Sequence, residues 1–316
     1  MARRRRKSKK FAGFFTAVLI VAALAYGVLS GAIPLDEIIE TATGGSPQVS
    51  TVSGALNPDA EFAVHFIDVG QADSVYIKAG EQNILIDAGE KESTRTNVCD
   101  YLRSLGVEKL DYVIGTHPHA DHIGGMQEVV ESFEIGTVIL PRLPDALIPT
   151  TRTYTGLLEA IAEKGISVSA AQDCSEIELS GGAKLTFLGP LSDYEELNSM
   201  SVCVKFSAAG YSVLLCGDAE KDAEKDMLAS GADLKCNILK LSHHGSSTSN
   251  TKEFLEAASP DCFVISVGEG NSYNHPTASV LERVNSYGKP VYRTDLNGTI
   301  VFEFLPDNQI KTITER

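Results

Sequence analysis

Short apolar runs, each followed by a glycine, an aspartate or a histidine, recur along the chain from about residue 61 onward. Runs of this length, bounded by turn residues, are typical of strands buried in a core. They predict strands at 64–69, 74–78, 84–86, 110–115, 212–216, 238–242 and 263–267. Apolar residues at helical spacing predict a helix at 123–133, and a segment rich in charge predicts another at 220–228. Strands that alternate with helices indicate an α/β domain.

The pattern differs at the start of the chain, where a basic segment precedes a long apolar one. Residues 3–10 contain seven Lys or Arg, and the run from 11 to 33 contains no charged residue. About 20 apolar residues span a bilayer as a helix, so this run is long enough. The basic flank is expected to stay in the cytoplasm, which places the rest of the chain outside the cell.

A cleavable signal peptide is the alternative for this apolar run. Small residues at Ala23, Ala25 and Gly31 would permit cleavage and give a secreted protein. Signal peptides usually have an apolar region of only about 7–15 residues, so the longer run favours an uncleaved anchor. We therefore predict a single-pass protein of the cell membrane. Its parts are a basic cytoplasmic head at 1–10, a transmembrane signal-anchor at 11–33, a flexible stalk at 34–60 and one extracellular domain at 61–316.

Net charge restricts the partners of this domain. The chain has 27 basic and 42 acidic residues, for a net charge of −15. Seven of the basic residues lie in the head, so the rest of the chain carries 20 basic against 42 acidic residues, or −22. Nonspecific binding of nucleic acid depends on Lys and Arg that neutralise phosphates. Solubility accounts for most of the acidic charge, but the charge still counts against a tight, general DNA binder.

The most informative stretch is Thr-His-Pro-His-Ala-Asp-His at 116–122, directly after the predicted strand at 110–115. It places His117, His119, Asp121 and His122 within six positions. Side chains two positions apart project to the same side of an extended segment, so the first three can converge. Imidazole and carboxylate ligands together suit Zn, Mn or Fe, and two such ions lie about 3.5–4 Å apart in hydrolytic enzymes. A His-rich surface loop is the alternative, but the strand–turn–helix context favours a metal site.

Three later positions after strands carry groups of the same chemistry. Asp218 follows the strand at 212–216, and a carboxylate there can bridge two cations. His243 and His244 follow the strand at 238–242, and His275 follows the strand at 263–267. Of the seven histidines, six lie in three such loops. Random placement would rarely produce this distribution.

Two strand-end carboxylates, Asp68 and Asp87, are candidates to orient the metal ligands. A metal-bound histidine usually donates its second ring N–H to a carboxylate or carbonyl. Each aspartate taken alone is an ordinary turn residue, but the histidine cluster gives both more weight. His65 lies within a strand, and we expect it to be packed in the core rather than to bind metal.

The six cysteines lack the C-x-x-C spacing of a cysteine zinc site. Cys203 and Cys216 lie symmetrically about the turn at Ala209-Gly210, so a cross-strand disulfide is one possibility in an oxidising location. Free cysteine is commonly buried, which favours the reading of both residues as small apolar core residues.

Several motifs recur together in one known family. The sequence around Asp68-Val69-Gly70-Gln71-Ala72-Asp73-Ser74, the histidine cluster, Gly217-Asp218, Ser242-His243-His244-Gly245-Ser246, His275-Pro276 and Thr294-Asp295-Leu296-Asn297-Gly298 resembles the metallo-β-lactamase superfamily. Within it, residues 61–305 resemble the domain at the end of ComEC-type DNA-uptake proteins and its free-standing relatives. The resemblance implies a four-layer αββα sandwich with a dinuclear metal site at one edge.

The chain departs from these relatives in two respects. ComEC-type channels have many membrane spans, whereas one is predicted here, so this chain cannot form a DNA conduit by itself. Many superfamily members supply a further histidine ligand in the middle of the fold, but residues 123–242 contain none. The subfamily has Asn-x-x-Ser there, which Asn198-Ser199-Met200-Ser201 resembles. A shell completed by water, Asn198 or substrate oxygen would favour Mn or a labile Zn, although Asn198 is equally readable as an ordinary loop residue.

The resemblance also implies roles for individual residues. His117, His119 and Asp218 would hold the first of two divalent ions, Zn or Mn, and Asp121, His122, Asp218 and His243 would hold the second. Hydroxide generated between the ions would attack phosphorus in line. The residues predicted to be catalytic are His275 as general acid, His244 as a substrate contact or its helper, and Asp121 at the metal. Ser246 is a candidate contact for phosphate oxygens.

Three functions fit these observations. The first is an extracytoplasmic hydrolase of phosphodiester bonds of the DNA type, and the second is a hydrolase of other cell-envelope phosphoesters, such as choline phosphate or teichoic-acid units. The third is a non-catalytic surface binding module, which the intact ligand set argues against. A basic groove beside the metals, built from Lys205, Lys240, Lys252 or Arg293, would favour DNA. The expected partners are a phosphoester substrate, possibly DNA, and the membrane. No feature of the sequence identifies a protein partner.

Overall fold

A computed structural model describes residues 49–51, 56–57, 60–93, 95–305 and 309–316. The predictions for the head at 1–10, the anchor at 11–33 and most of the stalk at 34–60 fall outside these residues. None of the helices in the described part of the chain is both long and apolar enough to cross a membrane. Residues from Val49 to Arg316 form one compact unit.

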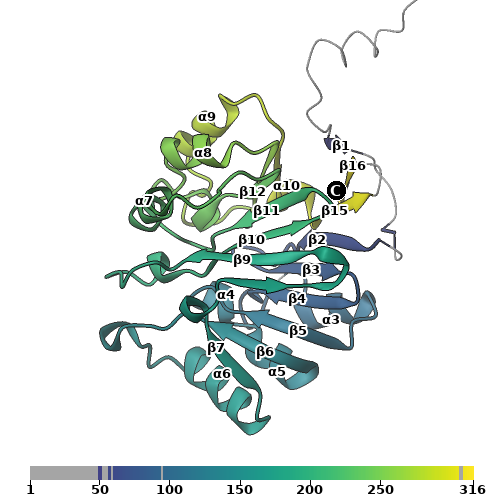
Figure 1. Ribbon diagram of the computed structural model, residues 1–316, viewed down its shortest axis with the longest axis vertical. Coiled ribbons are helices and arrows are strands. Elements are labelled where there is room, and N and C mark those ends of the chain that lie inside the picture. Colours follow the sequence, from purple (N-terminus) through teal and green to yellow (C-terminus); the bar gives the residue numbers. More distant parts are fainter. Residues whose placement is uncertain (1–48, 52–55, 58–59, 94, 306–308) are drawn as a thin grey trace, which may run out of the picture. The chain divides into compact units, whose positions relative to one another are not determined.

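Two β-sheets form the centre of this unit (Figure 1). In order across the first sheet, the strands are β1 (Val49–Thr51), β16 (Gln309–Thr314), β15 (Ile300–Leu305), β2 (Phe62–Phe66), β3 (Val75–Ala79), β4 (Gln82–Ile86), β5 (Lys109–Ile114), β6 (Glu134–Leu140) and β7 (Ser167–Ala170). The second sheet consists of β14 (Val291–Arg293), β13 (Cys262–Ile265), β12 (Ile238–Lys240), β11 (Tyr211–Leu215), β10 (Cys203–Ala208), β9 (Lys184–Gly189) and β8 (Glu176–Glu178).

The two sheets pack against each other because alternate residues of their strands are apolar. In β2, Phe62, Val64 and Phe66 belong to the core between the sheets, and so do Val213 and Leu215 of β11. Successive strand residues point to opposite faces, so the residues between these lie on the outer face of each sheet. Strands that are apolar on both faces, as β13 is, therefore read in the sequence as continuous apolar runs.

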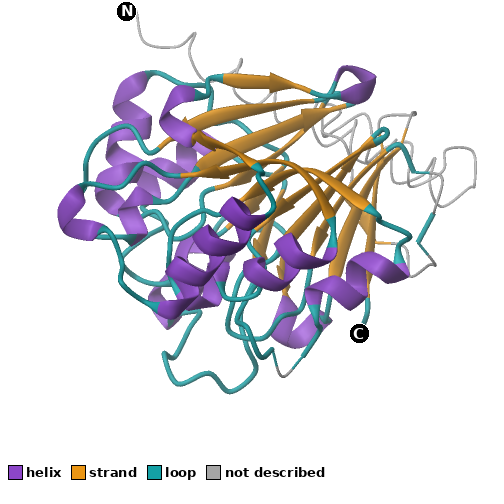
Figure 2. Cartoon of the chain, turned by 90° about the horizontal axis from the view of Figure 1, so that it is seen from below, coloured by secondary structure: helices purple, strands orange, loops and turns teal. Residues whose placement is uncertain are grey.

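Helices cover the outer faces. On the first sheet, Leu85 and Val113 pack with residues of α3 (Val98–Ser104), α5 (Met126–Ser132) and α6 (Arg152–Glu163). On the second, residues such as Leu214 and Phe263 pack with α7 (Lys221–Ser230), α8 (Lys252–Ala258) and α9 (Ala278–Asn285). Figure 2 shows helices on both sides of the paired sheets. The predicted four-layer αββα sandwich is therefore confirmed.

The predicted helix at 123–133 is interrupted in the structure. The chain instead forms α4 (Ala120–Ile123), then Gly124 and Gly125, then α5. A Cβ on Gly124 would lie 2.6 Å from the backbone nitrogen of Lys91, and one on Gly125 would lie 2.4 Å from the carbonyl oxygen of Ala88. The glycine pair thus lets the segment after the histidine cluster pack directly on the turn that follows β4. Apolar spacing alone could not reveal this contact, because it is made by backbone.

Parallel strands bring the ends of the two sheets together. β4, β5 and β6 run parallel in the first sheet, and β11, β12 and β13 run parallel in the second. A Cβ on Gly217, which follows β11, would lie 2.9 Å from Thr116, which follows β5. Gly217 also has a φ of +49°, a conformation that favours glycine. The loops at the carboxyl ends of both sheets are therefore in direct contact, and these loops carry the predicted site.

All six cysteines are free thiols. Cys203 on β10 and Cys216 directly after β11 are both buried, and the Sγ of Cys203 is 3.8 Å from the carbonyl oxygen of Cys216. They pack as small core residues, which is the reading that the sequence favoured.

Candidate metal centre

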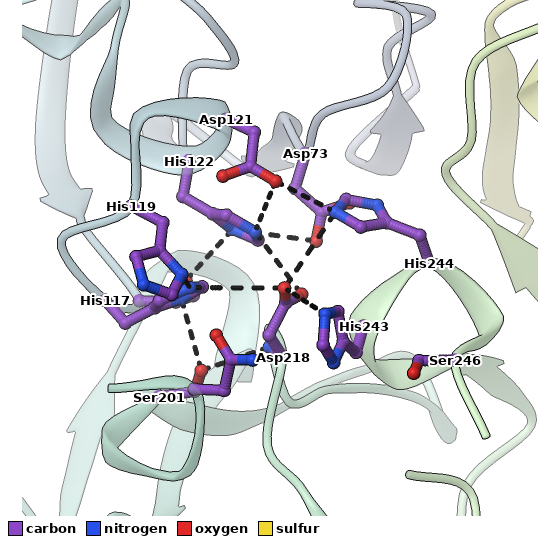
Figure 3. Close-up of polar contacts among 12 residues, drawn as sticks. Asp73, His117, His119, Asp121, His122, Ser201, Asp218, His243, His244 and Ser246 are labelled. Carbon is purple, nitrogen blue, oxygen red and sulfur yellow. Dashed lines mark hydrogen bonds and ion pairs between the residues drawn. The ribbon is translucent and has the colours of Figure 1, made fainter. Parts of the chain in front are cut away.

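The loop after β5 brings its histidines together (Figure 3). It stays extended as far as His119, which is the N-cap of α4 with φ −76° and ψ 151°. The Nε2 of His117 and the Nδ1 of His119 face each other at 2.9 Å, as expected for residues two positions apart in an extended segment. The chain then turns into α4, and this turn directs His122 into the same space from the helix. His117 and His122 are fully buried, whereas His119 lines a cleft.

Asp218, from the loop after β11, lies in the middle of the cluster. Its Oδ1 is 3.3 Å from the Nε2 of His122, and its Oδ2 is 4.0 Å from the Nε2 of His117 and 3.7 Å from the Nε2 of His243. Its backbone nitrogen donates a hydrogen bond to the Oγ of Ser201 at 3.0 Å. Figure 3 shows this one carboxylate in contact with imidazoles from both sheets. It has the central position that a bridging ligand requires.

The loop after β12 presents two histidines in different environments. His244 is buried, with its Nδ1 2.9 Å from the carbonyl oxygen of Ser266 and its Nε2 3.3 Å from the Oδ2 of Asp121. His243 is partly exposed, and its Nδ1 is 3.2 Å from the Oγ1 of Thr248. Both residues have a φ of +52°, a left-handed backbone conformation that is uncommon for residues other than glycine.

One group of four side chains has ligand atoms that all lie within 4.8 Å of one another. Its members are Asp121, His122, Asp218 and His244. The sequence had placed His243 in this group and His244 among the catalytic residues. The Ser266 carbonyl oxygen holds His244 inward, whereas His243 lies at the mouth of the cleft, with its Nε2 3.7 Å from the Oδ2 of Asp218. Residue spacing could not distinguish two adjacent histidines.

Asp87 and Thr116 support the cluster from behind. The Nδ1 of His122 is 2.7 Å from the Oδ2 of Asp87, so this ring nitrogen donates to the carboxylate. The Thr116 hydroxyl donates to the same oxygen at 2.7 Å, and the Thr116 backbone N–H donates to Oδ1 at 2.8 Å. With its Nδ1 proton fixed in this way, His122 presents its Nε2 to Asp218.

Opposite charges control protonation within the cluster. Burial lowers the pKa of His117 well below its usual value and also lowers the pKa of His119. Burial alone would likewise lower the pKa of His122, but the carboxylates of Asp218 and Asp87 together raise it well above its usual value. Conversely, burial would raise the pKa of Asp218, but His122 and His244 hold it well below its usual value. In the metal-free protein, a buried carboxylate is therefore matched by a buried imidazolium.

The centre contains buried polar atoms with no hydrogen-bond partner. These atoms include the Nε2 of His122 and the Oδ1 of Asp218. Such atoms are rare in folded proteins and call for a specific explanation. Both are good metal-ligand atoms that face each other, and nitrogen and carboxylate donors suit Zn, Mn or Fe. The residues therefore fit divalent metal ions.

A cleft of about 360 Å³ opens over the cluster. Among its lining residues are Asp121, Asp218, His243, Tyr273 and His275. The ring of Tyr273 is 65 % exposed and stacks on that of His275, with 5.9 Å between the ring centroids. The Nδ1 of His275 is buried without a hydrogen-bond partner. Burial and the neighbouring His243 lower the pKa of His275.

Asn198 also lines the cleft, whereas Asp68 and Ser246 make other contacts. Asn198 donates to the Oε1 of Glu220 at 3.2 Å, and its own Oδ1 is buried without a partner. The carboxylate of Asp68 is paired with Arg316 instead of a histidine of the cluster. The hydroxyl of Ser246 is 3.0 Å from that of Thr248, and Figure 3 shows it apart from the cluster. The structure thus brings Asn198 to the site but not Asp68 or Ser246.

The basic groove that would favour DNA does not form around this cleft. None of the described residues that line it is Lys or Arg. The four candidate cations are each paired with a carboxylate: Lys205 with Asp233, Lys240 with Asp73, Lys252 with Glu256 and Arg293 with Asp295.

The sequence did not indicate that three further residues support the metal ligands. Asp73 and Lys240 form a buried ion pair beside the ligands, and the Oγ of Ser201 lies 3.3 Å from the Nδ1 of His117. Asp73 and Ser201 both lie in the motifs described above, and this position was the one indication in the sequence that they belong to the metal centre. Lys240 is the only charged residue within its apolar strand. The alternation of residues along a strand does not show whether such a lysine is buried or lies exposed at the edge of a sheet.

Comparison with known proteins gives one consistent result. A family model described as the metallo-beta-lactamase superfamily matches residues 67–269. The chain is 32 % identical over 249 residues to "Competence protein ComA" of Neisseria gonorrhoeae, covering 78 % of this chain and 33 % of that protein. It is 27 % identical over 263 residues to "ComE operon protein 3" of Bacillus subtilis, covering 78 % and 33 %. The chain thus spans about a third of the length of these curated relatives.

A solved structure shares the fold. Igni18, described as a novel metallo hydrolase from Ignicoccus hospitalis, superposes with a TM-score of 0.51 at 20 % identity. The alignment covers 77 % of this chain and all of that one.

Proposed function

This chain belongs to the metallo-β-lactamase superfamily as a metal-dependent hydrolase, and from that premise we propose that it hydrolyses phosphoesters, with phosphodiesters as the main substrates. The observation that carries the proposal is the central position of Asp218 between imidazoles of both sheets. A shared carboxylate allows two cations to lie close together, and paired cations stabilise both the attacking and the leaving oxygen of an in-line displacement at phosphorus.

The residues divide into two groups around Asp218. His117 and His119 lie on one side of it, and Asp121, His122 and His244 lie on the other. When bound there, divalent ions would supply Lewis acidity and acidify a coordinated water near neutral pH. Asp87 keeps the Nδ1 of His122 protonated, and the Ser266 carbonyl oxygen does the same for His244, so the Nε2 atoms of both rings remain free to bind.

The mouth of the cleft provides the remaining chemistry. The imidazole of His275, which lines the cleft, is the group that exchanges a proton with the leaving oxygen, as general acid. His243 packs edge-to-face on His275, with ring centroids 5.5 Å apart, and it lies between His275 and the Asp218 carboxylate. This contact helps to hold the ring of His275 in place. The exposed ring of Tyr273 packs against the organic part of the substrate next to the phosphate.

The type of phosphodiester is a separate question. Similarity to proteins named for competence supports DNA-type phosphodiesters. The acidic charge and the cleft lined without Lys or Arg favour a second candidate, a small non-nucleic phosphoester of the cell envelope. A short single strand of DNA, or the end of a longer one, would agree with both the similarity to competence proteins and the acidic charge. Such a substrate brings few phosphates to the cleft.

The test is a substrate panel with the purified full chain loaded with Mn or with Zn. The panel contains a bis-aryl phosphodiester, an aryl phosphomonoester, a single-stranded oligonucleotide, a choline phosphodiester and a β-lactam. We expect metal-dependent turnover of the diesters that is lost in a chelator. Turnover of the lactam alone, or no metal-dependent turnover of any phosphoester, would overturn the proposal.

We further propose that the domain works outside the cell, anchored through residues 11–33. The basic head and the uncharged run support this orientation. Protease added to intact cells should then degrade the domain. Protection of the domain until the cells are lysed would contradict the orientation.

A further inference from the structure

A charged lysine is buried directly behind the metal ligands. The Nζ of Lys240, on β12, is 2.5 Å from the Oδ2 of Asp73, and the two side chains are only 2 % and 3 % exposed. Lysine is almost never buried so completely unless it is paired. Burial alone would lower the pKa of Lys240, but the carboxylates of Asp73 and Asp218 together raise it. The ammonium group is therefore a permanent positive charge inside the centre.

Asp73 is held by its backbone between the two loops that support the ligands. Its N–H donates to the carbonyl oxygen of Asp121 at 3.0 Å, and its own carbonyl oxygen accepts from the N–H of Gly89 at 2.8 Å. Its carboxylate points toward the histidines. The Oδ1 is 3.5 Å from the Nδ1 of His244 and has no hydrogen-bond partner, while the Oδ2 is 3.9 Å from the Nδ1 of His122.

We infer that Lys240 and Asp73 are a positioning pair, in which Lys240 fixes the Asp73 carboxylate so that it orients the imidazole of His244 for metal binding. The inference rests on the metal centre proposed above, and it assigns a role to two residues that the proposed reaction does not itself use. Neither residue lines the cleft, so neither contacts the substrate.

The tautomer of His244 explains how the pair acts. The Nδ1 faces the Ser266 carbonyl oxygen, which can only accept, so this nitrogen carries the proton. The Oδ1 of Asp73 lies on the same side of the ring and adds a negative charge that favours that proton. The Nε2, next to Asp121 and Asp218, is then the ring nitrogen that is available for a metal ion. Partners of this kind fix the ring orientation and raise the basicity of a histidine ligand.

The charge of Lys240 explains why Asp73 can fulfil this role. Asp73, Asp87, Asp121 and Asp218 together place four carboxylates in a small volume, and like charges that are close together repel one another. The ammonium group of Lys240 offsets that repulsion at Asp73 and holds the Oδ2 of its carboxylate, which leaves the Oδ1 toward His244.

The test is the double variant Asp73→Asn with Lys240→Met, made in the full chain. It removes both charges together, so no unpaired charge is left in the interior, and such replacements are often neutral for stability. The matched control is Asp233→Asn with Lys205→Met, which removes a lysine–aspartate pair from β10 of the same sheet, away from the ligands. Three properties are measured for each protein: the unfolding temperature in a chelator, the affinity for Mn and for Zn by calorimetric titration, and the visible spectrum with Co²⁺ bound.

We expect the double variant to fold in the chelator and to bind metal about 10–100-fold more weakly, with an altered cobalt spectrum. The control should match the wild type in affinity and spectrum. If the double variant does not fold, the single variant Asp73→Asn is tested by the same metal affinity and cobalt spectrum. The introduced amide oxygen can still accept a hydrogen bond from Lys240, so the lysine keeps a partner. Wild-type affinity and spectrum in the folded variant would overturn the inference and leave the metal centre intact. A wild-type protein that binds neither ion would overturn both.

Discussion

The interior of this protein contains two regions of opposite character. Between the sheets, side chains such as Phe66, Phe206 and Phe302 are fully buried and apolar. At the carboxyl ends of the strands, burial is just as complete, but Asp218, His122 and Lys240 are charged. The first region stabilises the fold by removing apolar surface from water. The second keeps charged groups out of water, and a protein retains such an arrangement where chemistry requires it.

Two buried histidines show the difference at the level of one side chain. His65 on β2 is buried with its Nδ1 2.8 Å from the hydroxyl of Tyr101, and burial lowers its pKa to about 3. His122 is equally buried, yet Asp218 and Asp87 overcome the effect of burial and raise its pKa well above the usual value. Partners, more than burial, therefore decide the charge of an interior group here. The following predictions test how independent the two regions are.

Replacing the central carboxylate should have the largest effect. Asp218→Ala removes the carboxylate that lies between the imidazoles on the two sides of the centre. Metal polarisation contributes several kcal/mol to transition-state stabilisation, so we expect turnover to fall on the order of 10³-fold or more. Metal analysis should show the loss of both ions, and the unfolding temperature with metal present should fall. A variant that retains two equivalents of Mn or Zn would contradict the bridging role.

Truncating the inter-sheet core should affect stability alone. Phe302 on β15 packs edge-to-face on Phe66 of its own sheet and on Tyr292 of the other, with ring centroids 5.9 and 5.6 Å apart. Phe302→Ala should lower the free energy of unfolding by about 3–5 kcal/mol, as measured by denaturant titration. Metal stoichiometry per folded molecule should stay unchanged. If Phe302→Ala lost metal while still folded, the two regions would not be independent, and Phe302→Leu, with a smaller cavity, should then show the same loss in weaker form.

His275→Ala should reduce turnover without reducing metal content. General acids contribute about 10²–10⁴-fold, and we expect the lower end because the lowered pKa of His275 leaves few rings protonated at neutral pH. The loss should be large for a natural phosphodiester and small for an activated aryl ester, whose leaving oxygen hardly needs a proton. Equal losses for both substrates, measured as kcat, would remove His275 from the proton transfer.

His65 should make the free energy of unfolding depend on pH, with no effect near neutral pH. Its pKa is about 3 in the folded protein and near 6.5 when exposed, so the unfolded chain binds more protons between these values. The contribution of His65 to the free energy of unfolding should thus be constant above about pH 6.5. As the pH falls below that value, the free energy of unfolding should decrease by up to about 1.4 kcal/mol per pH unit. In His65→Gln, the free energy of unfolding, measured by denaturant titration at each pH, should fall less steeply below about pH 6.5 than in the wild type. An identical slope in both proteins would show that His65 titrates normally.

The sequence predicted the framework of the site well. The histidine motif at 117–122, Asp218 and the loop at 243–244 all reach one cluster, because each directly follows a buried strand and parallel strands end at the same edge. The two-sheet fold was also identified, through motifs that recur in one order. In these respects, local pattern and global structure agree.

The remaining features depend on contacts that residue spacing does not encode. The inward position of His244 depends on the Ser266 carbonyl oxygen, and the interruption at Gly124 and Gly125 depends on backbone of another loop. Asp68 follows a strand in the same way as Asp87, but the carboxylate of Asp68 forms an ion pair with Arg316, at the other end of the chain. In each case the deciding partner is far away in sequence.

Asp218 and His244 follow strands of one sheet, whereas Asp121 and His122 follow a strand of the other, and this separation would link folding to the surroundings of the protein. An ion bound by all four would close a loop of about a hundred residues and would bind the folded chain in preference to the unfolded one. By mass action, a free ion at 100 times its dissociation constant adds about 2.7 kcal/mol to the stability. The lifetime of this protein against proteases should therefore vary with the free concentration of the metal, so that the abundance of the protein reports the supply of its cofactor.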